Sequence, residues 1–125
     1  VQTINRIINA FPSDRHDQVR TLLSFVLQGI VAQQLIPKTF ETGRALGMEI
    51  LIPTTAIRNL IREDKIHQVY SQMQVGQEKT GMITMNQSLK KSVDSGLIDI
   101  ETALNFTTAQ DELAKMLGLK EGKRK

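Results

Sequence analysis

The stretch VRTLLSFVLQGI, residues 19–30, has the strongest apolar pattern in the chain and predicts its principal helix. Apolar side chains recur there at intervals of three and four residues, which places them along one face of a helix. These positions are Val19, Leu22, Leu23, Val26, Leu27 and Ile30. We expect this helix to run to about Ala32. Because Gly29 disfavours helix, its presence predicts close packing by a neighbouring element.

Another helical pattern opens the chain. Its shared face consists of Val1, Ile4, Ile8 and Phe11. Pro12 is expected to end this helix, since proline disfavours helix at the residue before it. Ser13 or Asp14 then offers a capping oxygen to the next helix. Nothing ahead of Val1 can cap the first helix, so we expect a chain cut from a longer one.

Two extended segments follow the principal helix. Residues 33–38 and 44–52 have the composition of strands, and residues 39–43 between them are turn-like. This arrangement predicts a β-hairpin. Because two strands alone are marginal in water, we expect them to pack on the long helix or to extend a sheet supplied elsewhere.

From Pro53 onward the pattern is helical. Thr54 or Thr55 is expected to cap a short helix over residues 56–63, and Asp64 to cap the next. Further caps are expected at Asp99 and at Thr107 or Thr108, and helix ends at Gly96 and Gly118. The inward-facing positions are Ile66, Val69, Tyr70, Met73, Met82, Met85, Leu89, Val93, Ile100, Ala103, Leu104, Leu113, Met116 and Leu117. The expected fold class is therefore α+β and mostly helical.

The charge of the chain is concentrated at one end. The 125 residues include 16 Lys and Arg and 13 Asp and Glu, a net charge of +3. Residues 1–119 hold 12 basic and 12 acidic side chains, so the whole excess lies in residues 120–125. With no Trp, one Tyr and four Phe, the chain also offers few platforms for stacked bases. We therefore expect a solvated basic tail and no nucleic-acid partner. No apolar run approaches about 20 residues, so no membrane insertion is expected.

Motifs that would carry chemistry are missing from the sequence. There is no G-x-x-x-x-G-K-[ST] loop and no G-x-G-x-x-G turn, so a backbone cradle for phosphates is not predicted. His16 and His67 stand far apart in a chain without Cys, so no metal site is predicted either. No serine lies in a nucleophile-elbow spacing. We expect no catalytic, cofactor-binding or metal-ligating residues in this chain.

Residues 56–63 form the segment with the clearest candidate surface. Ile57, Leu60 and Ile61 make an apolar edge, and Arg58 and Arg62 lie one turn apart on the opposite side. Asn59 and Glu63 form a second polar pair. On one interpretation the arginines simply face water. On the other, two arginines four residues apart present planar forks to carboxylates on a partner. The pattern alone leaves both open.

The same segment, AIRNLIRE, resembles the signature of PilT-type pilus-retraction ATPases within the type II and type IV secretion ATPase family. Other blocks agree in order: residues 4–12 (INRIINAFP) are similar to DRIIDVFP, residues 27–37 (LQGIVAQQLIP) to LQGVISQQLLP, and residues 81–89 (GMITMNQSL) to GMQTMDQSL. Gly96-Leu97-Ile98 and Ala103-Leu104 match the family's GLI and EAL ending. The resemblance reaches about residue 117. Asp64 stands where family members often have Gly.

The resemblance implies a cytoplasmic, hexameric, RecA-like motor, peripheral to the inner membrane, whose ATP hydrolysis drives pilus retraction and twitching motility. The family's phosphate loop, acidic metal-binding motif and histidine motif lie upstream of the position matching Val1. This chain would thus bind neither ATP nor magnesium and would hydrolyse no ATP on its own. Its parent would bind ATP and magnesium and would hydrolyse ATP. Residues 1–53 would end the RecA-like core, residues 54–118 would form a helical C-terminal subdomain, and residues 119–125 would be a flexible basic tail.

The resemblance also implies partners and a site. The partners would be the other subunits of a homohexamer and the inner-membrane pilus machinery. The retraction role would fall on Ala56, Ile57, Arg58, Asn59, Leu60, Ile61, Arg62 and Glu63. The alternative from another class is a free-standing helical module for protein–protein interaction, which a coding sequence without an upstream phosphate loop would favour.

Overall fold

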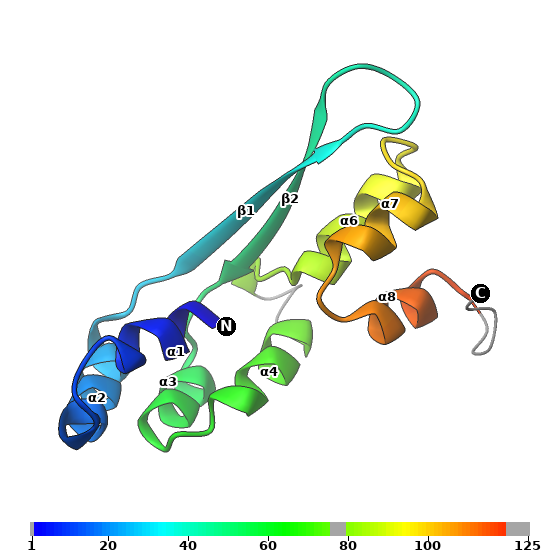
Figure 1. Cartoon of the computed structure of the whole chain (residues 1–125). Helices are drawn as coiled ribbons and strands as arrows, with labels where there is room; N and C mark the ends of the chain where they lie inside the picture. Colours follow the sequence, from blue (N-terminus) through cyan, green and yellow to red (C-terminus); the bar gives the residue numbers. More distant parts are fainter. Residues whose placement is uncertain (1, 76–79, 120–125) are drawn as a thin grey trace. The chain divides into compact units, whose positions relative to one another are not determined.

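A computed structural model describes residues 2–75 and 80–119 (Figure 1). The α-helices are α1 (Gln2–Asn9), α2 (His16–Val26), α3 (Thr55–Arg62), α4 (Val69–Val75), α6 (Met85–Asp94), α7 (Ile100–Phe106) and α8 (Gln110–Met116), with 3₁₀ turns η1 (Ser13–Arg15) and η2 (Ile66–Gln68). Strands β1 (Ile30–Pro37) and β2 (Arg44–Leu51) pair as an antiparallel hairpin. The predicted mixture of helices with one hairpin is therefore confirmed.

The chain folds as two compact units, and each takes residues from two stretches of sequence. One comprises the residues up to Val31 together with Ile50–Ile83, and the other comprises Ala32–Glu49 together with the residues from Thr84 onward. The predicted division after Pro53 concerns the domains of a parent protein and stays a prediction. The predicted basic tail lies almost entirely outside the described residues.

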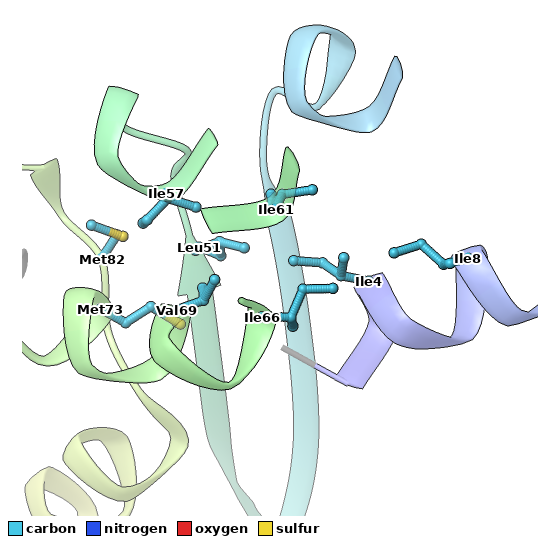
Figure 2. Close-up of a cluster of buried hydrophobic side chains, with 9 residues drawn as sticks. All are labelled: Ile4, Ile8, Leu51, Ile57, Ile61, Ile66, Val69, Met73 and Met82. Carbon is cyan, nitrogen blue, oxygen red and sulfur yellow. The ribbon is translucent and has the colours of Figure 1, made fainter. Parts of the chain in front are cut away.

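The core of the first unit forms around α3 (Figure 2). Its buried side chains are Ile4, Ile8, Leu51, Ile57, Ile61, Ile66, Val69, Met73 and Met82. Half-buried side chains of α2 pack against this cluster, among them Val19 and Leu23. The predicted inward positions Ile4, Ile8, Ile57, Ile61, Ile66, Val69 and Met73 are thus confirmed, whereas Phe11 is 46% exposed and Val1 lies outside the described residues. Full burial of side chains of this size contributes about 1.5–3 kcal/mol each.

The core of the second unit joins the turn end of the hairpin to α6, α7 and α8. It contains Ile36, Ala45, Leu89, Ile98, Ala103 and Leu113. A capping box starts α6: the Thr84 hydroxyl accepts from the Gln87 amide, and the Gln87 side chain accepts from the Thr84 amide. Gly47 on β2 leaves room for α6, because a Cβ there would lie 3.0 Å from Met85 Sδ.

Three helices end in the same way, with a residue in the left-handed conformation. For α6 and α8 this residue is Gly96 or Gly118, as predicted. For α3 it is Asp64, at φ 60°. Lys65 N donates to Leu60 O and Asp64 N donates to Ile61 O, which are the two hydrogen bonds of a Schellman motif.

The predicted extent of the principal helix is wrong. Helix α2 ends at Val26, Leu27 is extended with ψ 122°, and strand β1 has begun by Ile30. The apolar sequence around residue 30 fits a strand as well as a helix, and pairing with β2 decides between them. The predicted stripe also divides: Val19, Leu23, Leu27 and Ile30 pack inward, whereas Leu22 and Val26 are exposed.

Several predicted caps are also wrong. Neither Ser13 nor Asp14 caps α2, because these residues form η1. Asp64 ends α3 rather than starting the next helix. Helix α8 has no side-chain cap, and the Thr107 hydroxyl instead donates to Asn86 Oδ1 and accepts from Ala109 N. Met82 precedes α6 and lies in the core of the first unit. The predicted caps at Thr54 and Asp99 are confirmed.

Candidate functional site

Helix α3 is bounded at both ends by its own sequence. The Thr54 hydroxyl accepts from the Ile57 amide at 3.3 Å, and the Asp64 turn closes the other end. A helix of eight residues is unstable alone in water. Tertiary packing holds it here, because Ile57 and Ile61 are completely buried and Leu60 packs against the same cluster. Figure 2 shows Ile57 and Ile61 pointing into this core.

Arg58 reaches across to the C-terminal turn of α2. Its Nη1 donates to Ser24 O at 2.9 Å, with a longer contact to Phe25 O at 3.4 Å. The last carbonyls of a helix lack partners within the helix, and the helix dipole makes this end partly negative. A guanidinium therefore satisfies these carbonyls and complements their charge. Arg58 is half-buried in this position.

Arg62 contacts the same turn through a different surface. Its guanidinium carbon lies 5.0 Å from the centroid of the Phe25 ring, and its Nε lies 3.5 Å from Ser24 Oγ. Ser24 is buried, and its hydroxyl donates to Thr21 O at 2.6 Å. A cation over an aromatic ring at an exposed site contributes about 0.5–1 kcal/mol. Ser24 and Phe25 are thus shared by both arginines.

A third arginine joins α2 to the end of α3. Arg20 Nη1 donates to Asp17 Oδ1 at 2.7 Å. Its buried Nε lies 3.2 Å from Asp64 Oδ1, a distance typical of an ion pair, although the angle is unsuitable for a hydrogen bond. Such a partly exposed pair contributes at most about 1 kcal/mol. Together, Arg20, Arg58 and Arg62 hold α2 and α3 side by side.

Three other residues of the segment 56–63 face outward. Ala56, Asn59 and Glu63 are exposed, and Glu63 Oε2 lies 3.4 Å from Lys65 Nζ beyond the helix. The segment therefore has three surfaces: isoleucines in the core, arginines on α2, and Asn59 and Glu63 on the outside. The interpretation in which both arginines simply face water is wrong for Arg58. The docking role of residues 56–63 stays a prediction.

Sequence reasoning missed the α2 side of this site. Ser24 and Phe25 are contacted by Arg58 and Arg62, and Asp64 pairs with Arg20. None of these contacts was predicted. Phe25 falls outside the predicted apolar stripe, and this is the one local hint that its ring has another partner. The contacts join residues more than 30 positions apart, so no local pattern reports them.

Two further kinds of feature are absent from the described residues. Within residues 2–75 and 80–119, no group of His, Asp and Glu is arranged to hold a metal ion. None of the helices in these ranges has the length and apolar character that crossing a bilayer requires. A surface hollow borders residues 107–112 at the start of α8.

Comparison with known proteins identifies relatives of one kind. No family model matches the chain. The type IV pilus retraction ATPase PilT of Pseudomonas aeruginosa is 46% identical over 102 residues, which are 82% of this chain and 29% of that protein. A twitching motility protein of Neisseria gonorrhoeae is 44% identical over 102 residues, or 82% of this chain and 27% of that protein. The chain thus spans less than a third of the length of these relatives.

A solved structure agrees with this likeness. The crystal structure of the pilus retraction motor PilT with bound ADP matches with a TM-score of 0.80 and 50% sequence identity. The match covers 92% of this chain and 31% of that one. Sequence and fold therefore point to the same group of proteins, over the same limited share of their length.

Proposed function

This chain is homologous to PilT-type pilus-retraction ATPases, and from that premise we propose that it is the C-terminal part of a hexameric motor that powers type IV pilus retraction and twitching motility. The motor would hydrolyse ATP with magnesium in the part of the parent that this chain lacks. Support comes from the absence of a phosphate-binding loop in the sequence, and from a solved relative, about three times as long, that binds ADP.

The proposed place of the chain in the motor follows the same relationship. Residues 1–53 would end the RecA-like core, and residues 54–118 would form the helical subdomain behind it. The motor would be cytoplasmic and held at the inner membrane through the pilus machinery. Its partners would be the other subunits of the hexamer and that machinery.

The mechanical role is assigned to α3. This assignment rests on the division of the segment's residues among three surfaces. The core surface and the surface on α2 fix the helix, and the third surface is exposed to solvent. The buried isoleucines and the arginines make α3 move with its unit as one body. Asn59 and Glu63 are then available to transmit that motion to a neighbouring subunit or a membrane partner.

The test substitutes Asn59→Ala together with Glu63→Ala in the full-length motor. ATP turnover should stay within about twofold, since the nucleotide site is elsewhere, while pilus retraction is lost. The exposed Glu101 of α7 supplies a matched control, and Glu101→Ala should leave both activities unchanged. Normal retraction by the double variant would contradict the docking role of α3.

One observation fits the alternative of a free-standing interaction module as well as it fits the motor. Apolar side chains are exposed on α2 (Leu22, Phe25 and Val26) and on β1 (Val31 and Leu35). Such residues need cover, either from the rest of a motor or from a separate partner. The coding sequence upstream of Val1 separates the two: a phosphate-loop motif in the same reading frame supports the motor.

A further inference from the structure

The C-terminal end of α2 is a junction between helix and strand. The last helical hydrogen bond there runs from Leu27 N to Leu23 O, and only residues 27–29 separate the helix from β1. This connection is closely packed, since a Cβ on Gly29 would lie 3.3 Å from Leu51 O of β2. The direction in which β1 leaves the helix therefore depends on how the last turn of α2 is held.

Both arginines of α3 act on that last turn. Arg58 supplies donors to the carbonyls of Ser24 and Phe25, which the next residues do not fill. The Arg62 guanidinium lies over the ring of Phe25, a residue that is 64% exposed. The contacts use the features that distinguish Arg from Lys, namely a planar fork and a flat face that stacks on a ring.

We propose that Arg58 and Arg62 are positioning residues that fix the end of α2 and thereby couple α3 to strand β1, and that they do not themselves grip a partner. As an account of retraction, this inference rests on the proposed function. The arginines transmit displacement of α3 to the point where the chain enters the hairpin. The outward pair Asn59 and Glu63 remains the surface for a partner.

The first test is hydrogen exchange of backbone amides in the full-length protein. Arg58→Ala should speed exchange in the peptide covering residues 24–30 by roughly fivefold or more. The reason is that this segment can then open without breaking the hydrogen bonds that Arg58 donates to it. Arg15→Ala removes an exposed arginine just before α2 and should leave the same peptide unchanged. Equal exchange in wild type and Arg58→Ala would overturn the proposal, and this readout does not depend on what the motor does.

The second test is a double-mutant cycle on retraction speed. If Arg62 acts through Phe25, Arg62→Ala should slow retraction in the wild type but add little in a Phe25→Leu background. ATP turnover should be retained throughout, which separates positioning from a loss of fold. Arg58→Lys should recover part of the retraction lost in Arg58→Ala, since the lysine ammonium can still donate hydrogen bonds to these carbonyls but lacks the planar fork of Arg. Loss by the same factor in both backgrounds would mean that Arg62 grips a partner directly, and would overturn the proposal.

The two failures are distinguishable. If the full-length motor restores retraction in a strain that lacks it, the proposed function stands, and the cycle then judges the positioning role. If that motor turns over ATP but does not support retraction, the proposed function fails, and the retraction part of this inference fails with it.

Discussion

Asp64 shows how one residue can end a helix and also pair across to another. At φ 60° it holds a conformation that costs a residue with a Cβ about 1 kcal/mol, although Asp tolerates it better than most. Its carboxylate lies beside Arg20 of α2. The aspartate thus combines a strained backbone with an ion pair.

Substitution of Asp64 separates these two contributions. Asp64→Ala loses the carboxylate and also adds strain, because Ala tolerates a positive φ less well than Asp, so we expect the free energy of unfolding to fall by about 1–2 kcal/mol. Asp64→Gly also loses the carboxylate but removes the strain, so it should differ from wild type by less than about 0.5 kcal/mol. Urea unfolding of both variants measures this. Equal losses would show that the backbone conformation is unimportant.

Ile57 should be the most sensitive position of α3. It is completely buried in the first core, so Ile57→Ala should lower the free energy of unfolding by about 2–5 kcal/mol. The exposed Asn59 is its control, and Asn59→Ala should cost less than about 0.5 kcal/mol. Denaturant unfolding measures both, and similar losses would contradict the placement of α3.

Helix α2 shows what periodicity can and cannot determine at the scale of an element. The spacing of apolar residues correctly predicts a helix here, and glycines correctly predict the ends of α6 and α8. The end of α2 was mispredicted because strand pairing with β2, a contact distant in sequence, overrides the local pattern. The arginine contacts at Ser24 and Phe25 were missed for the same reason, since they exist only once α3 lies beside α2.

The burial difference within α2 is directly testable. Leu23 packs against the first core, whereas the adjacent Leu22 is 62% exposed. Leu23→Ala should therefore reduce stability by about 2 kcal/mol, and Leu22→Ala by less than about 0.5 kcal/mol. Thermal or urea unfolding of this pair measures the difference. Equal effects would mean that Leu22 is covered in the protein used.

Asp99 gives α7 a dependence on pH. Its side chain accepts from the Thr102 amide at 2.8 Å, and hydrogen bonding by Thr102 holds the pKa of this carboxyl below its ordinary value of 3.8. Because the folded pKa is the lower one, this stabilisation is present above the unfolded pKa and disappears as pH falls through the folded pKa. Asp99→Asn should abolish this component of acid destabilisation. Unfolding midpoints measured from pH 6 down to about pH 2 test it, and identical pH profiles would refute it.

At the scale of the whole molecule, the described residues form two cores and one hairpin. The spacing of apolar residues correctly predicts most of the inward positions, although Ile100 of α7 is 38% exposed. Sequence resemblance and fold likeness agree on PilT-type motors, over less than a third of the relatives' length. Under the proposed function, the phosphate loop of the nucleotide site would come from another part of the parent. Under the same proposal, the chain is a mechanical part of a larger motor.

The most direct test of that account is ATP turnover by this chain beside turnover by the full-length motor, with ATP and magnesium at equal molar concentrations of protein. The account predicts rapid phosphate release by the full-length motor and none above background by residues 1–125. Sustained magnesium-dependent phosphate release by the 125-residue chain itself would contradict it.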